Sequence, residues 1–193
     1  MRKLVVANIM SLDGYYTGPD DNIMVMPMDP SFDAHNVARL READTLLLGR
    51  KTYEGFRSFW PSVVDSPDAT DENREISRRD NEIEKVVISD TLTPDPTRPW
   101  YDTTRIVPRS AAHAEIEALK AKPGKDILVF GSQVLWRDLL AHGLVDELYL
   151  VLGGTVVGGG RPIFGPNPVA LTRLDVGVPA NTDNTILRYG IRR

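Results

Sequence analysis

The stretch that most constrains the fold runs from Asp44 to Phe56, where an apolar segment leads directly into a basic one. Thr45–Leu48 carries no charge and predicts a buried strand. Gly49 ends this strand, and residues 50–52 begin a predicted helix. A helix N-terminus offers unpaired backbone N–H groups and the positive end of the helix dipole. The two cations and the hydroxyl group found there favour phosphate binding. An ordinary β–α turn with solvated basic residues is the alternative.

Segments of strand length alternate with segments of helix length through most of the chain. The expected strands are Lys3–Ile9, Thr45–Leu48, Lys85–Ser89, Arg105–Val107, Asp126–Phe130, Val145–Leu152, Leu171–Val178 and Thr185–Ile191. The expected helices are Ser31–Glu42, Arg50 to about Trp60, Asp71–Ile83, Ala111–Ala121 and a helix that opens at Gly131–Gln133 and runs to Ala141.

This order of elements predicts an α/β fold. Strands that alternate with helices pair in parallel, with the helices as crossovers. The closing strands have no helix between them, so at least one should run antiparallel. No break in composition divides the chain, and we expect a single domain over residues 1–193. Its mostly parallel sheet should have about eight strands, with antiparallel C-terminal strands and flanking helices.

Composition excludes several classes of function. The net charge is −4 and the basic residues are scattered, so neither nucleic acid nor an anionic membrane is an expected partner. The chain has no cysteine, which excludes disulfides and thiolate catalysis. None of its three histidines, His35, His113 and His142, is spaced with another as a zinc pair, so no metal site is predicted. No apolar run approaches a membrane span or a secretion signal, and a cytoplasmic location is expected.

Polar and glycine-rich segments follow several of the predicted strands. In an open parallel sheet, ligands bind beyond the carboxyl ends of the strands. Ser11–Gly14, Gly49–Thr52, Ser89–Thr91 and Gly131–Gln133 should lie there. Two of these segments are helix starts, and two phosphate-binding helix starts on one edge suit a dinucleotide. The alternative is that Gly49 and Gly131 only permit close turns between strand and helix. The chain has neither a Gly-x-Gly-x-x-Gly fingerprint nor a Walker A sequence.

Asp13 and Asp33 are the acids nearest the expected cleft. A carboxyl group in an apolar pocket has a raised pKa and can serve in proton transfer. The competing interpretations are that Asp33 caps the first turn of its helix and that Asp13 shapes a turn. The run Gly158–Gly160 either lets the backbone approach a flat ligand or forms a flexible bend before Pro162.

Several segments in this order resemble a known family. They are Ser11–Gly14, Leu46–Glu54, Val86–Ser89, Asp126–Ser132, Gly143–Leu148 and Gly158–Phe164. Together they resemble the dihydrofolate reductase-like superfamily, and more closely the stand-alone proteins related to the C-terminal reductase domain of bacterial riboflavin biosynthesis. The resemblance extends from Lys3 to Arg188. It implies an eight-stranded sheet, NADPH as the hydride donor, a small-molecule substrate and a homodimer.

The resemblance also implies which residues bind the cofactor. The cofactor phosphates would be held by Gly49, Arg50, Lys51 and Thr52. Ser89 would lie near the adenosine end, and the pyrophosphate would be met by Gly131, Ser132, Gln133 and Val134. Ala7 and the loop at Asp13 and Gly14 would lie near the nicotinamide.

Two positions depart from the family pattern. Many relatives have an arginine where this chain has Asp90, and an aspartate repels a 2′-phosphate. NADH is therefore not excluded as the cofactor, although Arg50 could supply the positive charge. Riboflavin-pathway reductases usually have a glutamate where this chain has Phe130, and that glutamate contacts the sugar-phosphate substrate. The riboflavin intermediate is therefore not the implied substrate.

The leading hypothesis is an NADPH-dependent reductase that transfers hydride to a small heterocyclic substrate, pterin-like or pyrimidine-like. The cofactor carries the chemistry, and Asp33 or Asp13 would assist protonation. The alternative is a non-enzymatic nucleotide-binding or regulatory module on the same fold, which Asp90 and Phe130 favour. A flavin-linked reductase is a further alternative.

Overall fold

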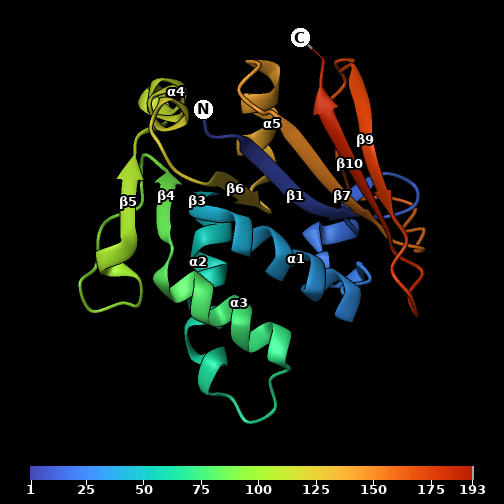
Figure 1. Ribbon diagram of the computed structural model, residues 1–193, viewed down its shortest axis with the longest axis horizontal. Coiled ribbons are helices and arrows are strands. Elements are labelled where there is room, and N and C mark those ends of the chain that lie inside the picture. The colour runs from blue at the N-terminus through green and yellow to red at the C-terminus, as the bar shows by residue number, and fades with distance from the viewer. Residues whose placement is uncertain (193) are drawn as a thin grey trace.

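A computed structural model describes residues 1–192 of the chain, and an eight-stranded sheet in the order β5-β4-β3-β6-β1-β7-β10-β9 forms its centre (Figure 1). The strands of this sheet are β1 (Leu4–Met10), β3 (Ala43–Gly49), β4 (Glu84–Ile88), β5 (Thr104–Val107), β6 (Asp126–Phe130), β7 (Glu147–Leu152), β9 (Leu171–Gly177) and β10 (Thr185–Ile191). Two short strands, β2 (Tyr15–Thr17) and β8 (Arg161–Pro162), pair separately. Arg193, the last residue of the expected domain, lies outside the described residues.

The sheet is parallel except at its C-terminal edge. β1 pairs in parallel with β6 and β7, and β3 pairs in parallel with β4 and β6. β10 runs antiparallel to both β7 and β9. A strand that follows its neighbour without a crossover helix pairs with it antiparallel. The α/β class, the eight strands and the antiparallel C-terminal strand are therefore confirmed.

Helices cover both faces of the sheet, as the predicted crossovers require. On one face lie α1 (Pro30–Glu42), α2 (Arg50–Phe59) and α3 (Asp71–Glu82), and on the other lie α4 (Ala112–Ala121) and α5 (Gln133–Ala141) (Figure 1). Alternate residues of β1 enter the two cores: Leu4 and Val6 pack with α4 and α5, and Val5 and Ala7 pack with α1. The predicted ends of the major elements lie within two residues of the observed ones.

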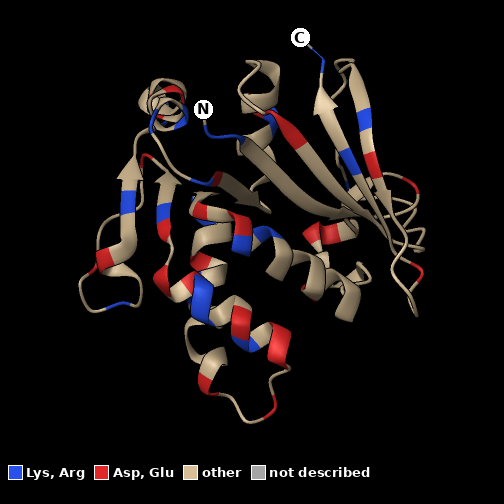
Figure 2. Ribbon diagram, viewed as in Figure 1, with Lys and Arg blue, Asp and Glu red and all other residues tan. Residues whose placement is uncertain are grey.

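The distribution of charge agrees with a sheet that is buried on both faces. β1 carries no charged residue, whereas α3 carries interspersed charges of both signs (Figure 2). Such mixed charge gives α3 no single-sign surface for a polyanion. Within residues 1–192, no helix combines the length and the apolar character that a bilayer span requires.

Candidate functional site

The two turns predicted to bind phosphate lie side by side, at the carboxyl ends of β3 and β6. β3 ends at Gly49 and leads into α2, and α5 begins at Gln133, shortly after β6. The backbone N–H of Gly49 donates to Oγ of Ser132 over 3.0 Å. In return, the backbone N–H of Ser132 donates to Oγ1 of Thr52 over 3.0 Å. Each turn therefore supplies the hydroxyl group that the other turn's amide requires.

The exposed face of the first turn carries the two predicted cations. Arg50 and Lys51 are exposed, and no acidic residue lies in the first turn of α2. The guanidinium group of Arg50 pairs with Glu54 at 3.1 Å, one turn further along the helix. An exposed pair of this kind contributes little stability, so Arg50 is readily available to an anion.

Gly131 lies against Thr52 of the first turn. Its φ is +53°, and a Cβ there would lie 2.9 Å from Cγ2 of Thr52 and 3.2 Å from the hydroxyl oxygen of Tyr16. The side-chain amide of Asn8 donates to the carbonyl oxygen of Gly131 over 3.3 Å. Only glycine fits this position without displacing a neighbour.

Asn8 and Tyr16 contact this turn and were not among the predicted site residues. Asn8 is buried at 5 % exposure and is the single amide side chain in the apolar strand β1. A single amide side chain in an otherwise apolar strand is a sequence feature that could have identified Asn8 as a site residue. Tyr16 lies on β2, which has only three residues and is too short for a periodic pattern to reveal.

The side chains of Gln133 and Val134 point in different directions at the start of α5. Nε2 of Gln133 donates to the carbonyl oxygens of Pro162 and Ile163, the latter over 3.1 Å. This buried side chain therefore fastens the segment around β8 to α5. Val134 is 74 % exposed. Their contact with a pyrophosphate remains a prediction.

The turn after β4 places Ser89 and Asp90 near the start of the segment that follows β5. Oγ of Ser89 accepts the N–H groups of Thr91 and Leu92, over 3.1 and 2.9 Å. Oδ1 of Asp90 accepts the backbone N–H of Arg109 over 2.9 Å, and Nε of Arg109 lies 3.6 Å from the same carboxylate. The negative charge at position 90 therefore has a cationic partner that the sequence did not reveal.

Asp13 holds a turn together. Its carboxylate accepts the backbone N–H groups of Val157, over 3.2 Å, and Gly158, over 2.8 Å. A hydrogen bond from the Ser11 hydroxyl, together with these backbone bonds, lowers the pKa of Asp13. The neighbouring Gly14 has a φ of +87°, which only glycine adopts readily. This geometry supports the turn-forming interpretation of Asp13, because a carboxylate held in its ionised form is a poor proton donor.

Asp33 lies on the first turn of α1, half-buried against α3. Burial raises the pKa of its carboxyl group, and this effect outweighs an opposing hydrogen bond from Asn73. The N-cap of α1 is Asp29, which accepts two backbone N–H groups of the first turn, so Asp33 is not the capping residue. Ala7, predicted near the nicotinamide, is buried on the face of β1 that α1 covers.

Within the glycine run Gly158–Gly160, Gly160 packs against the protein's own backbone, whereas a Cβ at Gly158 or Gly159 would meet no atom within 4 Å. A Cβ at Gly160 would lie 2.1 Å from the carbonyl oxygen of Thr17. The close approach that glycine permits is therefore made to β2, and Gly160 is part of a tight contact rather than a free bend.

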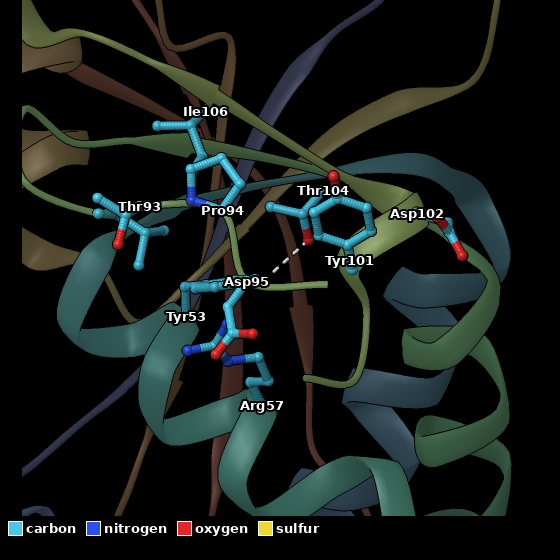
Figure 3. Close-up of a pocket in the computed structure, with 10 residues that line it drawn as sticks. Tyr53, Arg57, Thr93, Pro94, Asp95, Tyr101, Asp102, Thr104 and Ile106 are labelled. Atoms are coloured by element: carbon cyan, nitrogen blue, oxygen red, sulfur yellow. Dashed lines mark hydrogen bonds between the residues drawn. The ribbon is translucent and has the colours of Figure 1, made fainter. Parts of the chain in front are cut away.

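A cavity of about 340 Å³ lies elsewhere, between α2 and the loop before β5 (Figure 3). Its lining includes Tyr53, whose hydroxyl group lies 3.0 Å from Oγ1 of Thr104, and the facing side chains of Arg57 and Asp95. None of the predicted site residues lines this cavity. Its lining nevertheless includes Tyr53, which directly follows Thr52 of the first turn, and Leu92, whose backbone N–H donates to Oγ of Ser89.

The model of the family described as the RibD C-terminal domain matches residues 2–186. An uncharacterized protein of Bacillus subtilis (strain 168), YyaP, is 27 % identical over 163 residues, which is 84 % of this chain and 80 % of that protein.

Two solved structures share the fold. The putative riboflavin biosynthesis protein from Shewanella sp. PV-4 is 22 % identical, covers 100 % of both chains and has a TM-score of 0.71. Dihydrofolate reductase from Enterococcus faecalis, solved with NADP(H), is 16 % identical, covers 99 % of this chain and 97 % of its own, and has a TM-score of 0.61.

Proposed function

This chain belongs to the RibD C-terminal domain family, and from that premise we propose that it is an NADPH-dependent reductase that transfers hydride to a small heterocyclic substrate, pterin-like or pyrimidine-like. The observation that carries the proposal is the pair of cross-bonded turns at Gly49–Thr52 and Gly131–Gln133. The likeness of the fold to a dihydrofolate reductase solved with NADP(H) supports the choice of cofactor.

The residues at the two turns fit a dinucleotide. A hydroxyl group that accepts a backbone N–H keeps its own O–H to donate. Thr52 and Ser132 would therefore each offer a proton to a phosphate oxygen, beside the charges of Arg50 and Lys51. The absence of a Cβ at Gly131 lets the two turns pack closely together. The remaining proposed contacts are Gly49, Ser89, Gln133 and Val134 along the cofactor, and Ala7 and Gly14 near the nicotinamide.

When bound, NADPH supplies the hydride, and the chain would orient the nicotinamide and provide a proton. Of the two predicted acids, Asp33 suits the role of proton donor better. Its pKa is raised by burial, whereas the hydrogen bonds at Asp13 lower the pKa of that carboxylate. We assign Asp13 the role of holding the loop at Gly14 in place.

Titration of the purified, tag-free protein with NADPH tests the proposal. We expect saturable binding of one NADPH per chain, followed by oxidation of the cofactor with at least one member of a panel of pterins and pyrimidines. Native mass spectrometry of the same sample reports the stoichiometry and the assembly. Failure to bind at millimolar NADPH would refute the proposal.

A homodimer and a cytoplasmic location are parts of the same proposal. Three apolar side chains on the edge strand β9 and just beyond it are exposed by 42–77 %: Leu174, Val176 and Val178. An exposed apolar patch on a sheet edge favours pairing with a second copy. A cytoplasmic location follows from the need for a supply of NADPH.

A non-enzymatic nucleotide-binding module is the second candidate function. The exposed Asp90 carries a negative charge that repels a 2′-phosphate, and Phe130 is 7 % exposed within the core beneath α2, where it offers no polar contact to a substrate. Cofactor binding without oxidation across the whole panel would favour this candidate.

Replacing Asp90 by Arg is expected to raise the affinity for NADPH relative to NADH by roughly 10-fold, about 1.4 kcal/mol. The change replaces a negative charge near the proposed adenosine end with a positive charge. That positive charge would attract the 2′-phosphate of NADPH, which NADH lacks. Titration calorimetry with both cofactors measures the ratio, and the gain should shrink at high salt. The exposed Asp68→Arg serves as the control for net charge. An equal change for the two cofactors would contradict the placement of the adenosine end.

A further inference from the structure

Three metal-ligating side chains meet on the surface between α4 and α5. His113 lies in the first turn of α4, Asp138 lies on α5, and His142 is the C-cap residue of α5. Nε2 of His113 lies 2.6 Å from Oδ2 of Asp138, and Nδ1 of His142 lies 3.4 Å from Oδ1 of Asp138. One ligand atom from each residue lies within 4.8 Å of the others.

This cluster lies outside the proposed reductase site. The start of α5, at Gln133, belongs to the turn proposed to hold the pyrophosphate, whereas Asp138 and His142 occupy the other half of that helix and its end. His113 and His142 are too distant in sequence for their spacing to indicate a metal site. The fold brings their rings to a centroid separation of 4.1 Å.

We propose that His113, Asp138 and His142 form a binding site for a divalent transition metal, with Zn²⁺ as the expected occupant. Two imidazole nitrogens and one carboxylate oxygen form a ligand set typical of zinc, whereas Mg²⁺ and Ca²⁺ prefer oxygen ligands. With bonds of about 2.0–2.1 Å and tetrahedral angles, neighbouring ligand atoms lie about 3.3 Å apart. The observed separations are 2.6 Å to Oδ2 and 3.4 Å to Oδ1 of Asp138, and the three ligand atoms lie within 4.8 Å of one another. Side-chain rotations would therefore be needed to bring one carboxylate oxygen and the two nitrogens to the tetrahedral spacing.

The exposure of the three side chains determines how the metal would be held. They are 41 %, 48 % and 52 % exposed, which leaves the fourth position of the metal to water. Nδ1 of His142 also lies 2.8 Å from the backbone carbonyl oxygen of Asp138, a contact that binding through that nitrogen would give up. We therefore expect an exchangeable site that clamps α4 to α5, with a dissociation constant on the order of 1 μM.

Titration calorimetry of the tag-free protein with zinc chloride tests the site. We expect one Zn²⁺ per chain and no binding of Mg²⁺. At zinc concentrations about 100-fold above the dissociation constant, Tm should rise by roughly 5–10 °C.

One variant removes the two histidine ligands, and a second variant serves as its control. The double variant His113→Ala/His142→Ala should lose at least about 10-fold in zinc affinity and lose the rise in Tm. Asp175→Asn, which removes an exposed carboxylate of β9 that is not part of the cluster, should keep both. Circular dichroism without zinc checks that the double variant is folded. Unchanged zinc affinity in the folded double variant, or no saturable binding by the wild-type protein, would overturn the proposal.

Discussion

Replacing Gly131 by Ala is expected to weaken NADPH binding by roughly 100-fold, about 2.7 kcal/mol. The new Cβ would lie 2.9 Å from Cγ2 of Thr52 and 3.1 Å from Oγ1, the atom that accepts the backbone N–H of Ser132. Thr52 would have to move, and the two turns that are proposed to hold the cofactor phosphates would separate. Overpacking of this kind costs about 1–3 kcal/mol.

Gly143→Ala provides the matched control for this variant. Gly143 also has a positive φ, +70°, but a Cβ there would meet no atom within 4 Å. Both variants therefore carry the backbone cost of alanine in the left-handed region, roughly 1–2 kcal/mol, and only Gly131→Ala adds the collision. Titration calorimetry with NADPH compares them, and thermal unfolding confirms that both fold. Equal NADPH affinity in the two alanine variants would show that Gly131 has no role in binding the cofactor phosphates.

The second large effect concerns a buried charge pair between α3 and β4. Asp80 is 1 % exposed and Lys85 is fully buried, and Oδ1 of Asp80 has no hydrogen-bond partner. Burial raises the pKa of Asp80 to about 7 and lowers the pKa of Lys85 to about 8, and each charge partly offsets the effect on the other. Nζ of Lys85 lies 3.0 Å from Oγ1 of Thr103 and 4.6 Å from the ring centroid of Trp100.

The double variant Asp80→Leu/Lys85→Met is expected to unfold with a free energy about 1–4 kcal/mol higher than the wild-type protein near pH 7.5, because two desolvated charges are replaced by apolar groups of similar size. A raised carboxyl pKa means that the contribution of Asp80 to stability is lost as pH rises through about 7. A lowered amine pKa means that the contribution of Lys85 is lost as pH falls through about 8. The increase in the free energy of unfolding of the double variant should therefore be largest between about pH 7 and about pH 8. It should be smaller at pH 5 and at pH 10.

Urea unfolding across this pH range measures the gain. The control is the exposed pair Arg50–Glu54 on α2, whose atoms lie 3.1 Å apart, replaced by Met and Leu. That change should alter the free energy of unfolding by less than about 1 kcal/mol, because exposed pairs are screened by water. A double variant at Asp80 and Lys85 that is less stable than the wild-type protein throughout would show that the buried pair stabilises the fold.

The central strands of the sheet, such as β1, were predictable because they are largely continuous apolar runs. β6 and β10 match their predicted bounds. β3 is longer than predicted, because it also includes Ala43, Asp44 and Gly49, which are less apolar than the leucines at its centre. β2 and β8 were not predicted, because strands of three and two residues have no measurable period. The order of the strands is a property of tertiary packing, which local patterns do not encode.

The candidate site was only partly predictable. Helix starts at Arg50 and Gln133 follow from glycine and hydroxyl residues after buried strands. The hydrogen bonds between Thr52 and Ser132 depend on two strands being neighbours, which no short stretch of sequence reveals. The pairing of Asp90 with Arg109 has the same origin. The charge of one residue in the sequence therefore does not predict the net charge of the site in which it lies.

The placement of β1 at the middle of the sheet governs how the chain assembles. Leu4 pairs with Ile127, and Val5 pairs with Glu147, so β1 gains these partners only after the long segment between them has been synthesised. Until then the uncharged, apolar residues of β1 remain unpaired and can associate with other chains. Such distant pairing slows folding and invites aggregation. Yield in a recombinant host should therefore depend on slow translation or on chaperones that shield this N-terminal segment.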